Sequence, residues 1–215
     1  MKNKIKAVIF DMDGVLIDAK EWHYHALNRA LKLFGMQIEY EQHLRRFDGL
    51  PTKEKLMTLH KEKDLPLKLF NFIDQLKQKY TLEIVETSCH PQFQHEYLLS
   101  RLALDGYKLA VASNSIRKTI EVMLSKANII DYFDFYLSNQ DVVKSKPSPD
   151  IYIKAIDKLG LSPPECLIVE DNENGIKAAK ASGAHVLAIG NIEEVNYINI
   201  MNKISSLEGT QCLRS

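Results

Sequence analysis

The chain has 215 residues, and its 28 basic and 28 acidic side chains leave no formal net charge at pH 7. This length fits one domain, or one domain with an insertion, and it can bury a core without disulfide bonds or a structural metal. The balanced charge argues against a nucleic-acid partner, and the short apolar runs and three scattered cysteines favour a cytoplasmic protein with no membrane partner.

The first predicted strand is the apolar run Ala7–Phe10, and a long helical stretch follows it. Asp18 and Glu21 have the spacing of a capping box, and an apolar stripe over residues 22–34 ends at Gly35. Further helical patterns cover residues 40–47, 52–63 and 67–79.

Ninety-seven residues separate Phe10 from the next predicted strand, and this interval is far longer than a strand-to-strand crossover requires. We therefore expect a small α-helical cap domain, residues 18–89, inserted into a core made of residues 1–17 and 90–215. In the core, predicted strands at 108–113, 133–138, 166–170 and 185–189 alternate with helices at 116–128, 149–159 and 173–182. This alternation predicts an α/β fold with a doubly wound parallel sheet.

Polar side chains follow several of the predicted strands, where ligands of open α/β sheets bind. They are Asp11 and Asp13, then Ser113 and Asn114, then Lys146 in the loop after the third strand, and then Glu170 and Asp171. Carboxylates gathered in one place need a cation, and oxygen ligands without His or Cys favour Mg²⁺.

Lys146 and Ser113 are suited to hold a phosphoryl group opposite that ion. An aspartate can then serve as nucleophile, and the second one as general acid and base. Ser113 and Asn114 can also cap the following helix.

Four segments, DMDGV, ASNS, KSKPSPD and EDNENGI, resemble in order and spacing the motifs of the haloacid dehalogenase-like hydrolase superfamily, in its beta-phosphoglucomutase-like branch. The resemblance implies that Asp11 is the nucleophile and that Asp13 is the acid/base, with its backbone carbonyl on the metal. It also implies that Asp171 is a metal ligand and Glu170 a second ligand or an outer partner. The phosphate contacts would be Ser113, Asn114 and Lys146.

The cap offers three candidate substrate contacts, His23, Gly49 and Lys53. His23 stands where the branch often has a histidine facing the substrate, although a packing role fits it equally well. The mutases of the branch have an arginine close behind the glycine, and here Lys53 is the available cation. The main prediction is therefore a Mg²⁺-dependent phosphatase for a small phosphorylated metabolite, with a phosphomutase as the alternative.

Three other classes of function fit the sequence less well. A signalling receiver domain lacks a long insertion after its first strand, and a catalytically dead binding protein would lack motif residues. A dinucleotide-binding protein would have a G-x-G-x-x-G segment after the first strand. We expect a monomer.

Overall fold

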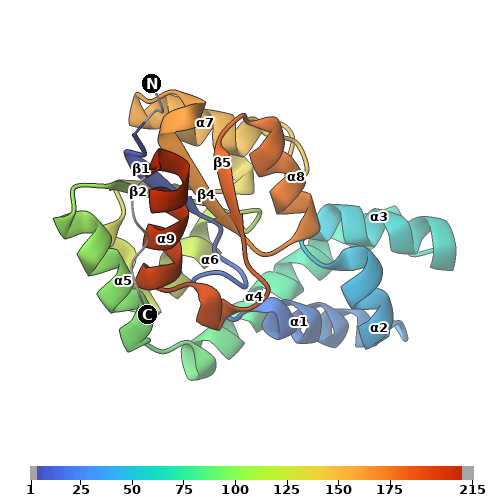
Figure 1. Cartoon of the computed structure of the whole chain (residues 1–215). Coiled ribbons are helices and arrows are strands. Elements are labelled where there is room, and N and C mark those ends of the chain that lie inside the picture. Colours follow the sequence, from blue (N-terminus) through green and yellow to red (C-terminus); the bar gives the residue numbers. More distant parts are fainter. Residues whose placement is uncertain (1–3, 210–215) are drawn as a thin grey trace.

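The structure, a computed structural model, describes residues 4–209, and its centre is a sheet of five parallel strands (Figure 1). The strands are β1 (Ala7–Phe10), β2 (Lys108–Ala112), β3 (Phe135–Leu137), β4 (Cys166–Glu170) and β5 (His185–Ala188). They lie in the order β3-β2-β1-β4-β5, so β1 is central and both of its neighbours come from distant parts of the chain. Phe10 pairs with Val111 of β2 and with Val169 of β4, which brings the three strand ends together.

Alternate side chains of the strands point to opposite faces, and helices cover both faces. Val8 and Phe10 belong to a buried cluster with residues of α5 (Phe93–Leu104), α6 (Arg117–Lys126) and α9 (Tyr197–Glu208). Ala7 and Ile9 belong to a second cluster with residues of α7 (Asp150–Leu159) and α8 (Glu173–Ala181). The predicted doubly wound α/β fold is confirmed, with the addition of α5 and α9, which the sequence analysis did not assign.

The segment between β1 and α5 forms the predicted α-helical cap, which projects from the carboxyl ends of the strands (Figure 1). Its helices are α1 (Lys20–Lys32), α2 (Tyr40–Gln42), α3 (Thr52–Lys63) and α4 (Phe70–Ser88), with a π-helical turn at His43–Phe47. The cap has its own apolar cluster, which includes Leu27, Leu31 and Phe47. Val85 near the end of α4 instead packs in the cluster of the sheet, so this helix joins the two units. The domain boundaries at residues 18 and 89 stay a prediction.

The start of the first cap helix differs from the sequence prediction. The helix begins at Lys20, and its N-cap residue, Ala19, has no side-chain capping bond, so the capping box of Asp18 and Glu21 was a wrong prediction. The reason is the preceding turn, in which the Ala19 N–H donates to the carbonyl of Ile17. Asp18 is therefore exposed to solvent and lies one residue before the N-cap position. Short 3₁₀ turns complete the structure, at Leu67–Leu69, Ile130–Tyr132, Asn139–Asp141, Pro163–Glu165 and Ile192–Glu194.

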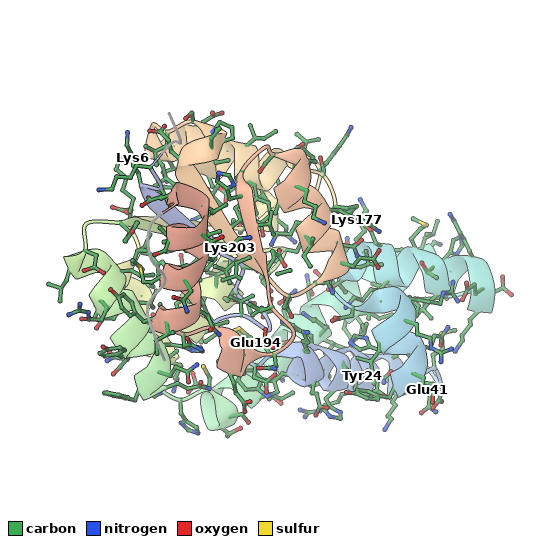
Figure 2. The ribbon with its side chains drawn as sticks, viewed as in Figure 1. Lys6, Tyr24, Glu41, Lys177, Glu194 and Lys203 are labelled. Atoms are coloured by element: carbon green, nitrogen blue, oxygen red, sulfur yellow. The ribbon has the colours of Figure 1, made fainter. Side chains whose placement is uncertain are left out.

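Charged side chains spread over the outside of both units in Figure 2. Two of the labelled lysines have local partners: Lys6 lies 2.5 Å from Glu165, and Lys177 lies 2.6 Å from Glu173 on the same face of α8. Such exposed pairs contribute little to stability because water screens them. Within residues 4–209, no helix is long and apolar enough to cross a membrane.

Candidate active site

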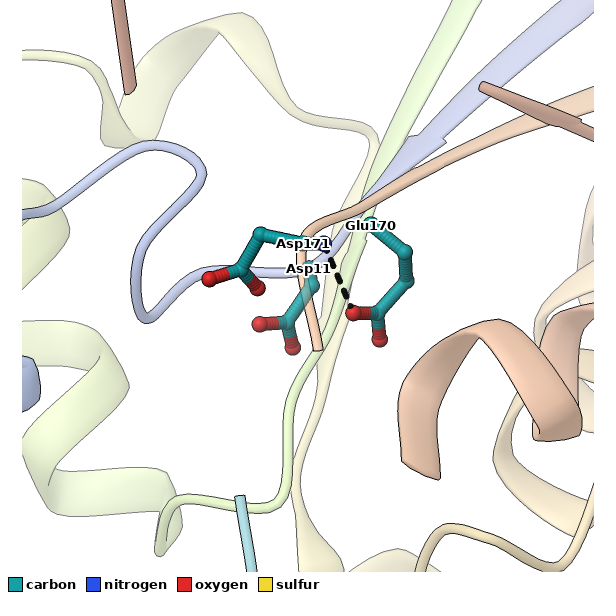
Figure 3. Close-up of side chains that lie close together, drawn as sticks. All are labelled: Asp11, Glu170 and Asp171. Atoms are coloured by element: carbon teal, nitrogen blue, oxygen red, sulfur yellow. Dashed lines mark hydrogen bonds between the residues drawn. The ribbon is translucent and has the colours of Figure 1, made fainter. Parts of the chain in front are cut away.

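Three carboxylates meet at the ends of β1 and β4: Asp11, Glu170 and Asp171 (Figure 3). Each offers an oxygen, and these oxygens lie within 4.8 Å of one another. They meet because β1 and β4 are hydrogen-bonded neighbours, and the Asp11 N–H still donates to the carbonyl of Val169 at 3.0 Å. The Asp171 carboxylate is also buried, and its Oδ1 has no hydrogen-bond partner among the described residues.

The electrostatics of this cluster favour a bound cation. Burial raises the pKa of Asp11 well above its ordinary value; Lys146 opposes this rise, and the neighbouring carboxylates add to it. Burial likewise raises the pKa of Asp171, from 3.8 to about 6, although the Lys20 ammonium lies 2.6 Å from Oδ2. Carboxylates this close together are costly to ionise unless a cation compensates their charge, and oxygen ligands favour a hard divalent cation such as Mg²⁺.

Lys146 connects the acidic cluster to the predicted phosphate-binding loop. Its buried ammonium donates to Asp11 Oδ1 at 2.7 Å and to Glu170 Oε1 at 2.6 Å. The Tyr152 hydroxyl donates to the same Glu170 oxygen at 2.5 Å, and the backbone N–H groups of Asp171 and Asn172 donate to Oε2. Both oxygens of Glu170 therefore already accept hydrogen bonds. This suits a residue that positions Lys146 beside the metal site rather than one that binds the metal directly.

Asp13 lies outside the three-carboxylate cluster, although it comes from the same strand end as Asp11. Its Oδ1 is 3.1 Å from His23 Nε2, and its Oδ2 accepts a hydrogen bond from Ser115. Lys77 Nζ lies 3.0 Å from the other ring nitrogen of His23. Because an ammonium can only donate, the ring proton of His23 is on Nε2 and is donated to Asp13. The expected gathering of four carboxylates is thus corrected to three, with Asp13 turned toward the cap.

The pKa values along this chain of contacts follow from the same geometry. Burial alone would raise the pKa of Asp13, but the hydrogen bonds from His23 and Ser115 outweigh it, and the pKa is lowered. Burial and the Lys77 charge lower the pKa of His23, so the ring is neutral at pH 7. Asp13 is therefore held as a carboxylate, the form that accepts a proton.

Ser113 and Asn114 lie between the strand ends and the lysine loop. Ser113 is buried, and its hydroxyl accepts from the Ser115 N–H. The Asn114 side chain donates to the carbonyls of Gly49 and Lys146 and accepts from the Lys146 N–H. Neither residue caps α6, whose N-cap is Ile116, so the helix-cap alternative is excluded.

Part of the backbone at these strand ends is free to bind an anion. Within residues 4–209, the N–H groups of Met12, Asp13 and Asn114 have no hydrogen-bond acceptor. Unpaired backbone donors beside a buried lysine can bind the oxygens of a phosphoryl group.

The cap reaches the core through the loop that contains Gly49. This residue has a φ of +71°, and a Cβ placed there would lie 2.5 Å from Asn172 Oδ1. Asn172 in turn donates to Asp48 Oδ2 at 3.0 Å. Glycine is required both by the backbone conformation and by the close approach of the core.

A cavity of about 520 Å³ lies between the strand ends and the cap. Asp171 is the one candidate residue that does not line it. The candidate residues that do are Asp11, Asp13, His23, Gly49, Lys53, Ser113, Asn114, Lys146 and Glu170. Lys53 is exposed, whereas Lys55, two residues later, is buried.

Several residues of this site were not predicted from the sequence, namely Lys20, Lys55, Lys77, Tyr152 and Asn172. Asn172 follows β4 by two residues, so extending the strand-end inspection by one residue would have found it. The other four lie within helices, and nothing in their spacing distinguishes them from surface or core positions.

Comparisons with known proteins agree with this geometry. A family model described as haloacid dehalogenase-like hydrolase matches residues 8–189. A phosphorylated carbohydrates phosphatase from Thermotoga maritima is 29% identical over 182 residues, which cover 83% of this chain and 82% of that protein. A phosphoglycolate phosphatase from Aquifex aeolicus is 31% identical over 181 residues, with coverage of 83% and 82%.

A solved structure of beta-phosphoglucomutase from Clostridium difficile has the same fold, with a TM-score of 0.83 at 21% identity. The similarity covers 95% of this chain and 99% of that one, so it includes the cap as well as the core. The family model, in turn, includes residues of all five strands, from Val8 in β1 through β5. On these grounds the chain belongs to the haloacid dehalogenase-like hydrolase family, and the predicted resemblance to its beta-phosphoglucomutase-like branch is confirmed.

Proposed function

We propose that the protein is a Mg²⁺-dependent phosphatase that hydrolyses a small sugar phosphate through an aspartyl-phosphate on Asp11. The observation that carries this proposal is the position of Asp11, which lies beside Lys146 and two further carboxylates at the wall of the cavity. A carboxylate in such a place can attack a phosphoryl group whose charge is neutralised on both sides.

The residues around Asp11 bind and orient the phosphoryl group. Lys146, the Ser113 hydroxyl and the unpaired N–H groups of Met12 and Asn114 bind its oxygens. Asp11 and Asp171 are the ligands available to Mg²⁺, together with the backbone carbonyl of Asp13, and Glu170 positions Lys146 beside them. When bound, the ion supplies positive charge that keeps Asp11 ionised and offsets the charge of the phosphoryl group.

In the first step, a carboxylate oxygen of Asp11 attacks phosphorus, and the bond from phosphorus to the sugar oxygen breaks. Asp13, a carboxylate in the free protein, must take up a proton before this step; it then gives that proton to the sugar oxygen, so the sugar leaves as an alcohol. In the second step, Asp13 takes a proton from water, and the water oxygen attacks the phosphorus of the aspartyl-phosphate. The bond to Asp11 then breaks, which releases phosphate and restores both carboxyl groups.

His23 and Lys77 are positioning residues for this proton transfer. They come from α1 and α4 of the cap and hold the Asp13 carboxylate by way of the His23 ring. The proton-transfer group is therefore oriented only while the cap lies against the core.

The test is a phosphate-release assay over a set of sugar phosphates and other small phosphoesters, with and without Mg²⁺. We expect Mg²⁺-dependent release, and a loss of at least about 1,000-fold in kcat for Asp11→Asn. The matched control is Asp131→Asn, the same substitution at an exposed aspartate, and it keeps full activity. Phosphate release at the same rate with and without Mg²⁺, or at the wild-type rate in the Asp11→Asn variant, would contradict the proposed mechanism.

The same assay separates the phosphatase from the phosphomutase alternative. Residues 50–53 behind Gly49 read Leu-Pro-Thr-Lys, so the arginine expected of a mutase is absent, and this supports the phosphatase. Conversion of β-glucose 1-phosphate to glucose 6-phosphate without equivalent phosphate release would support the mutase instead. The monomeric state and the cytoplasmic location stay predictions.

A further inference from the structure

Lys20 connects the first helix of the cap to a carboxylate of the core. It is the first residue of α1, and its ammonium lies 2.6 Å from Oδ2 of Asp171. The side chain of Asp171 is only 1% exposed, so water screens this ion pair little on the carboxylate side. No other described side chain forms an ion pair or a hydrogen bond with that carboxylate. Within residues 4–209, Lys20 is therefore the one cation in direct contact with Asp171.

The oxygen that Lys20 contacts lies beside the loop after β1. A Cβ added to Gly14 would be 2.1 Å from Asp171 Oδ2 and 2.6 Å from Cε of Lys20, so both side chains pack against this glycine. Gly14 directly follows Asp13, whose backbone carbonyl accepts no hydrogen bond from any described residue. A cation shared by that carbonyl and Asp171 needs the same side of the carboxylate that the Lys20 ammonium contacts.

Lys20 differs from Lys146, the other lysine in contact with the acidic cluster. The side chain of Lys146 is 4% exposed and donates to two carboxylates, so it is held in place. The side chain of Lys20 is 34% exposed and has one such partner, so it can leave Asp171 by rotating toward solvent. Asp18 and Asp48 also attract its charge, which gives the ammonium other acidic neighbours when it leaves. Lys20 is therefore a displaceable cation, whereas Lys146 is a fixed one.

The charges of the cluster favour exchange of Lys20 for a metal ion over the binding of both. Three carboxylates meet here, and Lys20 and Lys146 already bring two positive charges to them. A divalent cation added to both lysines would make the cluster net positive. Like charges at such short distances repel strongly in a buried site. Departure of Lys20 leaves its carboxylate free to bind the ion.

We propose that Lys20 competes with Mg²⁺ for Asp171 and thereby sets the metal affinity of the site. This inference rests on the proposed function, because it takes Asp171 as a ligand of the ion. Lys20 belongs to the cap and Asp171 to the core. The contact of α1 with the core and the binding of the ion therefore weaken each other by the same factor. The cap in this way regulates how tightly the core binds its metal.

The first test measures the binding of Mg²⁺ alone by calorimetry at pH 8, without substrate and in about 150 mM salt, which screens distant charges. We expect Lys20→Met to bind Mg²⁺ about 10-fold more tightly than the wild type, because the ion no longer has to displace a charged hydrogen bond. Lys20→Arg keeps the positive charge, and its affinity is expected to stay within about 3-fold of the wild type.

Lys32→Met is the matched control for the first test. It removes the same charge from an exposed position in the last turn of the same helix, and it keeps the wild-type affinity. An unchanged affinity in Lys20→Met would overturn the proposal. A weaker affinity would overturn it as well, because it would show that Lys20 orients Asp171 for the ion and does not compete with it.

A second measurement follows the side chain of Lys20 in the wild-type protein, so it does not depend on the folding of a variant. Acetylation of lysines, quantified by mass spectrometry, reports how freely each amine leaves its partner. We expect saturating Mg²⁺ to raise the labelling rate of Lys20 by about 3-fold or more, because the ion displaces it. The rate of Lys32 in the same sample stays constant. A labelling rate of Lys20 that is the same with and without Mg²⁺ would overturn the proposal.

Failure of this inference and failure of the proposed function give different results. A Mg²⁺-dependent phosphatase whose metal affinity is the same in Lys20→Met contradicts only the inference. Tighter Mg²⁺ binding by Lys20→Met in a protein that releases no phosphate contradicts only the phosphatase. The absence of Mg²⁺ binding in both the wild type and Lys20→Met contradicts the metal site, and the inference with it.

Discussion

Several charged side chains of the cavity are buried, and their neighbours decide in which direction each pKa moves. Burial raises the pKa of Asp11 and Asp171, whose neighbours include other carboxylates. Asp13 is partly buried, yet donors from His23 and Ser115 lower its pKa. Burial alone would lower the pKa of Lys146, but two neighbouring carboxylates raise this pKa above its ordinary value. For Lys55, burial and the charge of Lys77 together lower the pKa to about 8. The cavity thus holds paired charges at the core and an uncompensated cation in the cap.

Replacing Lys55 with Met is expected to raise the free energy of unfolding. Methionine keeps an apolar chain in the same space and removes a buried charge that forms no ion pair within residues 4–209. A pKa lowered from 10.5 to about 8 corresponds to a gain of at most about 3 kcal/mol at pH 7. Urea unfolding in a phosphate-free buffer measures this gain.

The predicted gain depends on pH in a defined direction. Below about pH 8, Lys55 is charged in the folded and the unfolded chain, so the cost of the buried charge is fully present. Between about pH 8 and 10.5, the unfolded chain binds more protons than the folded one, and the difference from the Met variant disappears. Lys61→Met, at an exposed position, is the control and gains nothing. A difference that stays constant from pH 7 to 10 would contradict this explanation.

At the scale of elements, the cap meets the core through a few polar contacts at the strand ends. The loop before α3 is held by Asn172, which donates to Asp48, and by Asn114, which donates to the carbonyl of Gly49. Helix α1 adds the contact of His23 with Asp13. All of these core residues belong to the loops that form the site, so the position of the cap and the geometry of the site are coupled.

Gly49→Ala is expected to lower kcat/KM by about 10-fold or more, because the added methyl group pushes the cap loop away from Asn172. The matched control is Gly35→Ala, which has a similar positive φ of +69° but no atom within 4 Å of the new Cβ. Both variants lose about 1 kcal/mol of stability from the strained backbone. Kinetics together with thermal unfolding separate the two effects, and equal losses of activity in both variants would contradict the role of the loop contact.

At the scale of the whole molecule, the zero net charge conceals two different arrangements of charge. Exposed pairs such as Lys6 with Glu165 compensate each other locally (Figure 2). The strand-end cluster instead concentrates three carboxylates within 4.8 Å, with only partial compensation by lysines. Folding therefore brings like charges together at one place, and a ligand cation that binds there stabilises the folded state as a whole.

Mg²⁺ is expected to raise the unfolding temperature, because it binds the folded chain and not the unfolded one. A concentration 100 times the dissociation constant adds about 2.7 kcal/mol. The effect is smaller at pH 5 than at pH 8, because the pKa of Asp171 is about 6 and protons then compete with the metal. Calorimetry of the wild-type and Asp171→Asn proteins checks this, and an equal rise in both would contradict the assigned site.

The sequence alone predicted the sheet and the core side of the site for a physical reason. Strands buried on both faces have short apolar runs, and the carboxyl ends of parallel strands meet at one edge, so the residue after each run marks the site. Asp11 and Asp171 were predicted in this way, and Lys146 was predicted from the loop after the third strand. Helix α9 was missed because its Asn, Ser and Ile residues form helices weakly, and its helical state depends on packing against the sheet.

Only the tertiary structure decided which cap residues reach the cavity. The helical patterns located α1, α3 and α4, but the face that each turns toward the core depends on how they pack against one another. That packing turned Asp13 toward His23, placed Lys77 behind the ring, and buried Lys55 rather than Lys53. The sequence by itself determined the fold class and the chemistry of the strand ends, because both follow from local patterns. The surface facing the substrate was decided by contacts between distant segments.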